Sequence, residues 1–153
     1  IEPNKIQYMS AGSGITHSEF NPTPSPVHLL QIWIEPNIYG APPTYQEQTL
    51  KPIPSNTLDL IVSGDGRHQS VPIRQDADLY RGLFTKDASV EFTTKPHHTQ
   101  WIQVIHGDLL VQNTPLSQGD ACGISKEKAF SLTARTDVHF LLFEFSESTP
   151  ERR

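Results

Sequence analysis

Short runs of apolar and polar residues, broken every few positions by proline or glycine, extend along most of the chain. The chain has 153 residues, and its 13 prolines and 9 glycines disfavour long helices. Between these breaks the runs are rich in β-branched and aromatic residues, which is typical of strands. The fold class expected from this pattern is all-β, a sandwich or barrel of short strands. The pattern predicts strands at Lys5–Ser10, Ile15–Phe20, Val27–Glu35, Leu58–Ser63, Leu79–Thr85, Ser89–Thr94, Gln100–His106, Leu109–Gln112, Phe130–Thr133 and Val138–Phe145.

The pattern changes near Pro36–Asn56, where prolines gather among polar residues, and we expect an interdomain connection there. Downstream, residues 57–145 supply enough strands for one complete small barrel. Upstream the pattern gives about three strands, too few to bury a sheet face on their own. We therefore expect residues 1–50 to be the remnant of an N-terminal domain plus its linker, with the beginning of that domain missing. Residues 51–153 are expected to form a C-terminal structural domain.

Charge and composition narrow the possible partners. The formal net charge is −5, which disfavours direct binding to nucleic acid, because such binding needs clustered Lys and Arg. No stretch approaches the roughly 18–20 apolar residues that span a bilayer, so no membrane partner is expected. The first residues lack the layout of a signal peptide. A single cysteine, Cys122, excludes an internal disulfide, and a cytoplasmic location is the simplest expectation.

The segment from Gln7 to Asn21 contains the candidate chemistry. Gly12 and Gly14 predict a tight turn between two strands. His17 and Glu19 are two residues apart, so on a strand both side chains leave the same face. An imidazole and a carboxylate on one face can ligate a divalent metal, and this mixed set suits iron, manganese, nickel, copper or zinc. From these two residues alone, a polar strand face with a hydrogen-bonded histidine is the alternative interpretation.

Longer strings of residues resemble a known family. The spacing Gly-x-x-His-x-x-x-Asn, which begins at Gly14, matches the end of the second cupin motif. The string Met-Ser-Ala-Gly-Ser-Gly-Ile-Thr-His-Ser-Glu at 9–19, followed by Leu-Leu-Gln-Ile-Trp-Ile at 29–34, closely resembles pirins, including bacterial pirins with quercetin 2,3-dioxygenase activity. The segments Asp78–Arg81 and Trp101–Gly107 look like parts of the second pirin domain.

The resemblance implies a bicupin fold, in which each domain is a double-stranded β-helix or jelly-roll barrel. Here it implies one partial N-terminal barrel and one complete C-terminal barrel. In the family the metal, commonly iron, is held by three histidines and one glutamate. His17 and Glu19 align with the His-Ser-Glu motif that supplies two of these ligands. The other two come from a His-x-His motif on an earlier strand, which is absent from this chain, so half of the metal site is expected here.

For the intact parent, the resemblance implies a metal-dependent dioxygenase that acts on flavonol-like, quercetin-type substrates. Glu19 would also be the catalytic base for the substrate hydroxyl. The expected cofactor is a divalent metal, with iron favoured over zinc, manganese, nickel and copper, and this chain alone is expected to be inactive. The expected partners are a small aromatic substrate and either the missing N-terminal fragment or a second copy. The alternative is a non-enzymatic metal-sensing regulator or protein-binding module, since some pirins regulate transcription factors.

The C-terminal barrel is expected to have lost its own metal ligands. Gln100 stands where the first cupin motif would carry its glutamate, and the histidine position of the second motif falls on Phe130. His97 and His98 are adjacent, so a strand would turn them to opposite faces, and we expect them in a solvated loop. This barrel is therefore expected to be structural.

Overall fold

The computed structural model describes residues 4–147, and these are almost entirely β-structure. Apart from one 3-10 turn, no helix occurs between residues 4 and 147, and none there is long and apolar enough to cross a membrane. The all-β prediction is confirmed. The elements are β1 (Lys5–Ser10), β2 (Thr44–Thr49), β3 (Thr57–Ser63), η1 (Arg67–Gln69), β4 (Val71–Pro72), β5 (Ala77–Phe84), β6 (Ser89–Thr93), β7 (His98–His106), β8 (Leu109–Val111), β9 (Thr114–Leu116), β10 (Ala121–Ile124), β11 (Ala129–Ala134) and β12 (Val138–Ser146).

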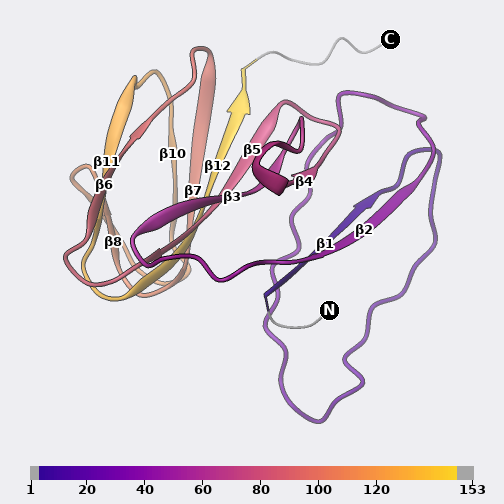
Figure 1. Cartoon of the computed structure of the whole chain (residues 1–153), viewed down its shortest axis with the longest axis horizontal. Coiled ribbons are helices and arrows are strands. Elements are labelled where there is room, and N and C mark those ends of the chain that lie inside the picture. Colours follow the sequence, from indigo (N-terminus) through magenta and orange to yellow (C-terminus); the bar gives the residue numbers. More distant parts are fainter. Residues whose placement is uncertain (1–3, 148–153) are drawn as a thin grey trace.

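Two sheets form a barrel from β3 to β12, on one side of the molecule in Figure 1. The larger sheet has the strand order β10-β7-β12-β5-β3-β4, and the smaller has the order β6-β11-β8-β9. Every neighbouring pair in these sheets is antiparallel except the β3–β4 pair. The complete C-terminal barrel predicted from residues 57–145 is thus confirmed.

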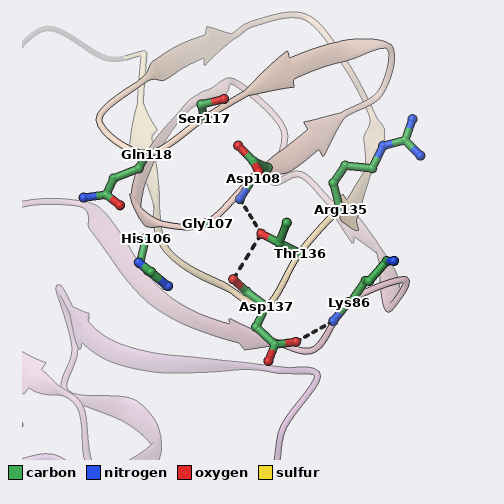
Figure 2. A pocket seen from close by; sticks show the side chains of 9 residues that line it. All are labelled: Lys86, His106, Gly107, Asp108, Ser117, Gln118, Arg135, Thr136 and Asp137. Carbon is green, nitrogen blue, oxygen red and sulfur yellow. Dashed lines mark hydrogen bonds between the residues drawn. The ribbon is translucent and has the colours of Figure 1, made fainter.

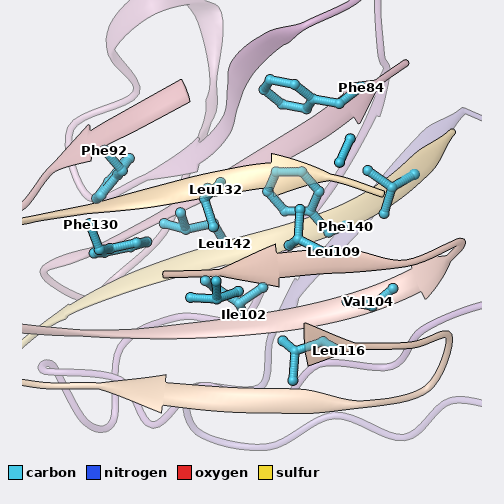
Figure 3. Packing of buried hydrophobic residues seen from close by; sticks show 13 residues of the cluster. Phe84, Phe92, Ile102, Val104, Leu109, Leu116, Phe130, Leu132, Phe140 and Leu142 are labelled. Atoms are coloured by element: carbon cyan, nitrogen blue, oxygen red, sulfur yellow. The ribbon is translucent and has the colours of Figure 1, made fainter. Parts of the chain in front are cut away.

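The core of the barrel is built by alternation along its strands (Figure 3). On β7, Ile102 and Val104 point inward and are buried, whereas Trp101 before them is exposed and Gln103 between them is partly exposed. On β12, Phe140 and Leu142 are fully buried in the same core. Aromatic and branched side chains from both sheets meet there and exclude water, which is the main source of the barrel's stability.

The outer face of the larger sheet is also covered, by the hairpin of β1 and β2. These two strands pair antiparallel from Lys5 opposite Thr49 to Ser10 opposite Thr44. Ile6 and Tyr8 of β1 pack against a second buried cluster on the outer face of the sheet. The members of that cluster are Ile61, Val62, Val71, Leu79, Leu141 and Phe143. β12 is therefore apolar on both faces, and the hairpin is tied to the barrel by hydrophobic burial.

Residues 11–43 form a long irregular loop between β1 and β2 (Figure 1). The strands predicted at Ile15–Phe20 and Val27–Glu35 are absent, and these two predictions are wrong. A strand needs a neighbour for its backbone N–H and C=O groups, and no strand in the described range 4–147 pairs with either segment. Conversely, β2 lies within the stretch that was expected to be only a connection, because it finds its partner in β1. The short strands β4, β9 and β10 were also not predicted.

Candidate metal centre

The loop that carries the candidate ligands is closed at its base by a tight turn. The N–H of Ser13 donates to the Ala41 carbonyl at 3.1 Å, and the N–H of Gly14 donates to the Ala11 carbonyl at 2.8 Å. Gly12 has a φ of 53°, and a Cβ at this position would lie 1.9 Å from the Ala41 oxygen. Only glycine fits so close an approach in the left-handed region. The turn predicted from the glycines is present, but it follows one strand, β1, and leads into irregular chain rather than into a second strand.

Arg74, from the barrel, binds both ends of the loop. Its Nη1 donates to Ser10 Oγ at 3.1 Å and to the Pro42 carbonyl at 3.0 Å, and its Nη2 donates to Thr44 Oγ1 at 3.0 Å. The N–H of Asn37 donates to the Arg74 carbonyl at 2.8 Å. A guanidinium with several fixed donors suits such a role. Arg74 therefore holds the two ends of the loop together beside the barrel, and the middle of the loop projects away.

His17 and Glu19 lie in this projecting loop, and both side chains are exposed. Neither takes part in a hydrogen bond or ion pair with another part of the described chain. Both are therefore available as donors to an external group. The structure brings no third candidate to them, since residues 4–147 contain no group of three or more His, Cys, Asp or Glu able to hold a metal. Their role as metal ligands stays a prediction.

Large apolar side chains in the same loop are uncovered as well. Phe20 is 81% exposed and Trp33 is 88% exposed, unusually high values for residues of this size. Exposed apolar residues gathered in one segment mark a surface that binds something, because burial of each such side chain is worth about 1.5–3 kcal/mol. We call this set the uncovered apolar set. Its members are Ile15, Phe20, Val27, Leu29, Leu30, Ile32 and Trp33.

In the C-terminal barrel, the positions predicted to have lost ligands serve packing. Phe130 is buried in the core, and the Gln100 amide donates to Glu144 Oε1 at 3.1 Å. His97 lies in an exposed turn with a φ of 58°, as expected. His98, however, begins β7 and is partly buried, so the loop prediction is wrong for this residue. The difference arises because β7 starts two residues earlier than the strand predicted from Gln100.

A group of buried charges at one end of the barrel interior was missed by the sequence pattern. Asp78 and Glu144 each interrupt an apolar strand, where a lone carboxylate is easily taken for a solvent-facing position. Both are buried. Burial acts to raise the pKa of Asp78, but hydrogen bonds from Arg67 and Lys95 outweigh it, and the pKa falls below the ordinary value of 3.8. The carboxylate is therefore ionised inside the barrel.

A hollow of about 730 Å³ opens between turns of the barrel (Figure 2). Its polar groups hold the turns together. Asp137 Oδ1 accepts the N–H of Lys86 at 2.9 Å, and Thr136 Oγ1 accepts the N–H of Asp108 at 2.9 Å. The side chains of Arg135 and Lys86 extend away from these contacts (Figure 2). Charges of both signs line the hollow without converging on one point, so it defines no ligand chemistry.

Two protein families match separate parts of the chain. Residues 60–145 match the family described as the quercetinase C-terminal cupin domain. Residues 1–34 match the family described as pirin. The first match covers most of the barrel, and the second covers β1 and the part of the loop that carries His17 and Glu19.

Two curated relatives match this chain at similar identity and over a similar share of their own length. The quercetin 2,3-dioxygenase of Escherichia coli (strain K12) is 34% identical over 145 residues, which cover 94% of this chain and 62% of that protein. A putative quercetin 2,3-dioxygenase of Pasteurella multocida (strain Pm70) is 32% identical over 147 residues, with 94% and 62% covered. The chain thus spans about three-fifths of the length of these curated relatives.

Solved structures show the same fold. The crystal structure of YhhW from Escherichia coli superposes with a TM-score of 0.92 at 34% identity, and the match covers 97% of this chain and 63% of that chain. The crystal structure of the bacterial pirin YhhW in complex with nickel(II) gives a TM-score of 0.89 at 34% identity, with 95% and 62% covered. The cupin fold expected from the sequence is confirmed.

Proposed function

Because this chain belongs to the pirin family, we propose that its parent protein is a metal-dependent dioxygenase that acts on flavonol-like substrates of the quercetin type. The observation that carries the proposal is the free and exposed His17–Glu19 pair in the segment that matches pirins. The name of the Escherichia coli relative, quercetin 2,3-dioxygenase, supports the substrate class.

We propose His17 and Glu19 as two of the metal ligands. Their donor set, one imidazole and one carboxylate, fits a divalent transition metal, and iron is our first choice. The nickel(II) complex of a bacterial pirin supports a divalent ion. Two protein ligands hold a metal weakly, so further ligands are needed. We propose that an N-terminal part of the parent supplies them, with a second copy of the chain as the other source.

The uncovered apolar set supports this arrangement. Leu29, Ile32 and Ile34 lie in the segment that matches pirins. The structure leaves Leu29 and Ile32 exposed and Ile34 half-buried. A polypeptide that pairs with residues 15–35 would satisfy their backbone groups and bury these side chains in one step. The same polypeptide would bring additional ligands toward His17 and Glu19.

The roles of the residues follow from their chemistry. A metal bound at His17 and Glu19 would act as a Lewis acid that binds substrate oxygens. The Glu19 carboxylate would accept the proton of the substrate hydroxyl. A ring nitrogen of the His17 imidazole would ligate the metal. Phe20 and Trp33, once covered, would exclude water from the site.

The test uses the intact parent protein loaded with iron, with oxygen uptake measured in the presence of quercetin. Parent protein carrying His17→Ala should lose its metal, because one of four expected ligands is gone. Glu19→Gln should lower the rate of oxygen uptake about 100-fold or more, the usual contribution of a general base. His28→Ala is the matched control, since His28 is an exposed histidine of the same loop.

Two outcomes would count against the proposal. Full iron content in the His17→Ala parent would remove His17 from the ligand set. If the parent binds iron through His17 but takes up no oxygen with quercetin, the metal site stands and the dioxygenase activity is rejected.

A further inference from the structure

The connection between β4 and β5 is fixed to the barrel by its own contacts. The N–H of Ile73 donates to the Ser63 carbonyl of β3 at 2.9 Å, and the Ile73 side chain packs against the buried cluster on the outer face of the larger sheet. Gly64 lets the chain pass closely, because a Cβ there would lie 2.6 Å from the Gln75 carbonyl oxygen. Arg74 and Gln75 therefore present their donors to the loop of residues 11–43 from a fixed backbone.

These two residues contact the loop at its ends and also within its second half. The Arg74 guanidinium hydrogen-bonds to both ends of the loop. The Arg74 carbonyl accepts the N–H of Asn37 at 2.8 Å, and Gln75 Nε2 donates to the Glu35 carbonyl at 2.7 Å. The segment just after Trp33 is thus bound to the barrel through its backbone, independently of the loop ends.

The candidate ligands lie between these points of attachment. Within the part of the chain that the structure describes, residues 15–32 hydrogen-bond only to one another. His17 comes three residues after Gly14, whose turn closes the attached base of the loop. The positions of His17 and Glu19 therefore depend on the attachments on either side of them, all of which involve Arg74 or Gln75 or the turn at Gly14.

We propose that Arg74 and Gln75 are positioning residues of the metal centre, which fix from the C-terminal barrel where the loop holds His17 and Glu19. Because it concerns the same site, this role rests on the function proposed above. Ligands on a loop bind a metal tightly only when the loop is ordered beforehand, since otherwise binding must supply the lost conformational entropy. Groups that orient ligands typically contribute about 10–100-fold to metal affinity. The barrel, which has lost its own ligands, thereby takes part in the chemistry of the neighbouring site.

The test uses the intact parent protein and nickel(II), the ion bound in the complex of a bacterial pirin. Affinity is measured by competition with a chelator, and the ligand-field absorption of the bound ion is recorded at saturating nickel(II). The variants are Arg74→Ala, Gln75→Ala and the conservative Arg74→Lys, with Arg135→Ala at a distant turn as the matched control. Parent protein carrying His17→Ala shows how much of the binding passes through the proposed centre. Amide exchange in β7 and β12 reports whether the barrel is folded.

Arg74→Ala should bind nickel(II) about tenfold or more weakly than the parent, and the absorption of its bound ion should shift because the ligands meet the metal in a different geometry. Gln75→Ala should change both properties in the same direction but less, since it removes one contact with the loop. Arg74→Lys should lie between Arg74→Ala and the parent, because an ammonium keeps a donor but cannot reach all three acceptors. Arg135→Ala should match the parent.

Equal affinity and equal absorption in Arg74→Ala and the parent would overturn the positioning role while the metal centre stands. Weaker binding with unchanged absorption would also overturn it, because a merely structural role lowers stability without altering the geometry around the bound ion. If His17→Ala leaves nickel(II) binding as it is, the proposed metal centre fails, and the positioning role fails with it. If Arg74→Ala unfolds the barrel, Gln75→Ala decides: shifted absorption supports the proposal, and absorption like that of the parent contradicts it.

Discussion

The absence of a side chain on Gly82 leaves room for the ring of Phe140 in the barrel core. A Cβ on Gly82 would lie 2.3 Å from the ring atom Cζ of Phe140, and that ring is fully buried and stacked on Phe84. Because the ring has nowhere to move, Gly82→Ala should lower the free energy of unfolding by about 1–3 kcal/mol. Urea unfolding measures this. Gly123→Ala is the matched control, since its new methyl would meet Trp101 at an ordinary 3.6 Å. Equal losses for both variants would contradict the steric reason.

His139 gives the barrel a pH dependence near neutrality. Burial, with Arg81 and His106 nearby, lowers its pKa below the ordinary 6.5. Below pH 6.5 the unfolded chain therefore binds more protons than the folded chain, so stability falls as the pH falls. His139→Gln should flatten the change in unfolding free energy between about pH 7.5 and about pH 5.5, as measured with urea. The exposed His28, changed to Gln, should leave the slope as it is.

Single residues differ in how far the sequence reveals their role. His17 and Glu19 could be proposed from the sequence because their motif is long and local. The buried group of Asp78, Glu144 and Gln100 could not, because it forms only when three strands align in register. One sequence shows which residue types a strand contains, but the register that joins distant strands is a property of the fold.

The strands of the barrel were predicted well where each had both an alternating pattern and a partner. β7 and β12 pair along most of their length and match their predicted ranges closely. The segments Ile15–Phe20 and Val27–Glu35 also contain apolar residues at strand-like spacing, yet they are irregular, because no neighbouring strand in the described range satisfies their backbone. β2 is largely polar, so pairing with β1 rather than composition makes it a strand.

The β1–β2 hairpin depends on Arg74, which joins Ser10, Pro42 and Thr44. Arg74→Ala removes these contacts and should loosen the hairpin, although Ile6 and Tyr8 still pack on the sheet, while the barrel stays folded. Amide hydrogen exchange should quicken about tenfold or more in β1 and β2, since a hydrogen bond to a charged group is worth about 1.5 kcal/mol or more. Exchange in β5, β7 and β12 should be unchanged. Arg135→Ala, at a distant turn of the barrel, is the control, and faster exchange throughout the barrel would show that Arg74 supports more than the hairpin.

The molecule as a whole combines a closed barrel with a two-stranded hairpin that carries a long exposed loop. The barrel from β3 to β12 buries its core between two sheets, whereas the loop of residues 11–43 leaves its apolar side chains exposed. Composition indicated this division, because the strands upstream of the prolines were too few to close a sheet. The chain also spans only about three-fifths of its curated relatives. The proposed metal centre lies in this exposed loop, and we propose that a partner covers it.

Trp33 reports whether that partner is present. It is 88% exposed, and the only other tryptophan is Trp101, so Trp101→Phe leaves a single fluorescent reporter. In the chain alone, Trp33 should emit at long wavelength and be quenched freely by acrylamide. In the proposed longer parent carrying the same substitution, the emission should shift to shorter wavelength and quenching should weaken several-fold, because the apolar set is then covered by an upstream polypeptide. Size measurement of the chain alone separates this cover from a second copy, which would protect Trp33 only at concentrations where a dimer forms. Equal quenching in the chain and in the parent would show that Trp33 faces solvent in both, and the uncovered apolar set would no longer support a completed barrel around His17 and Glu19.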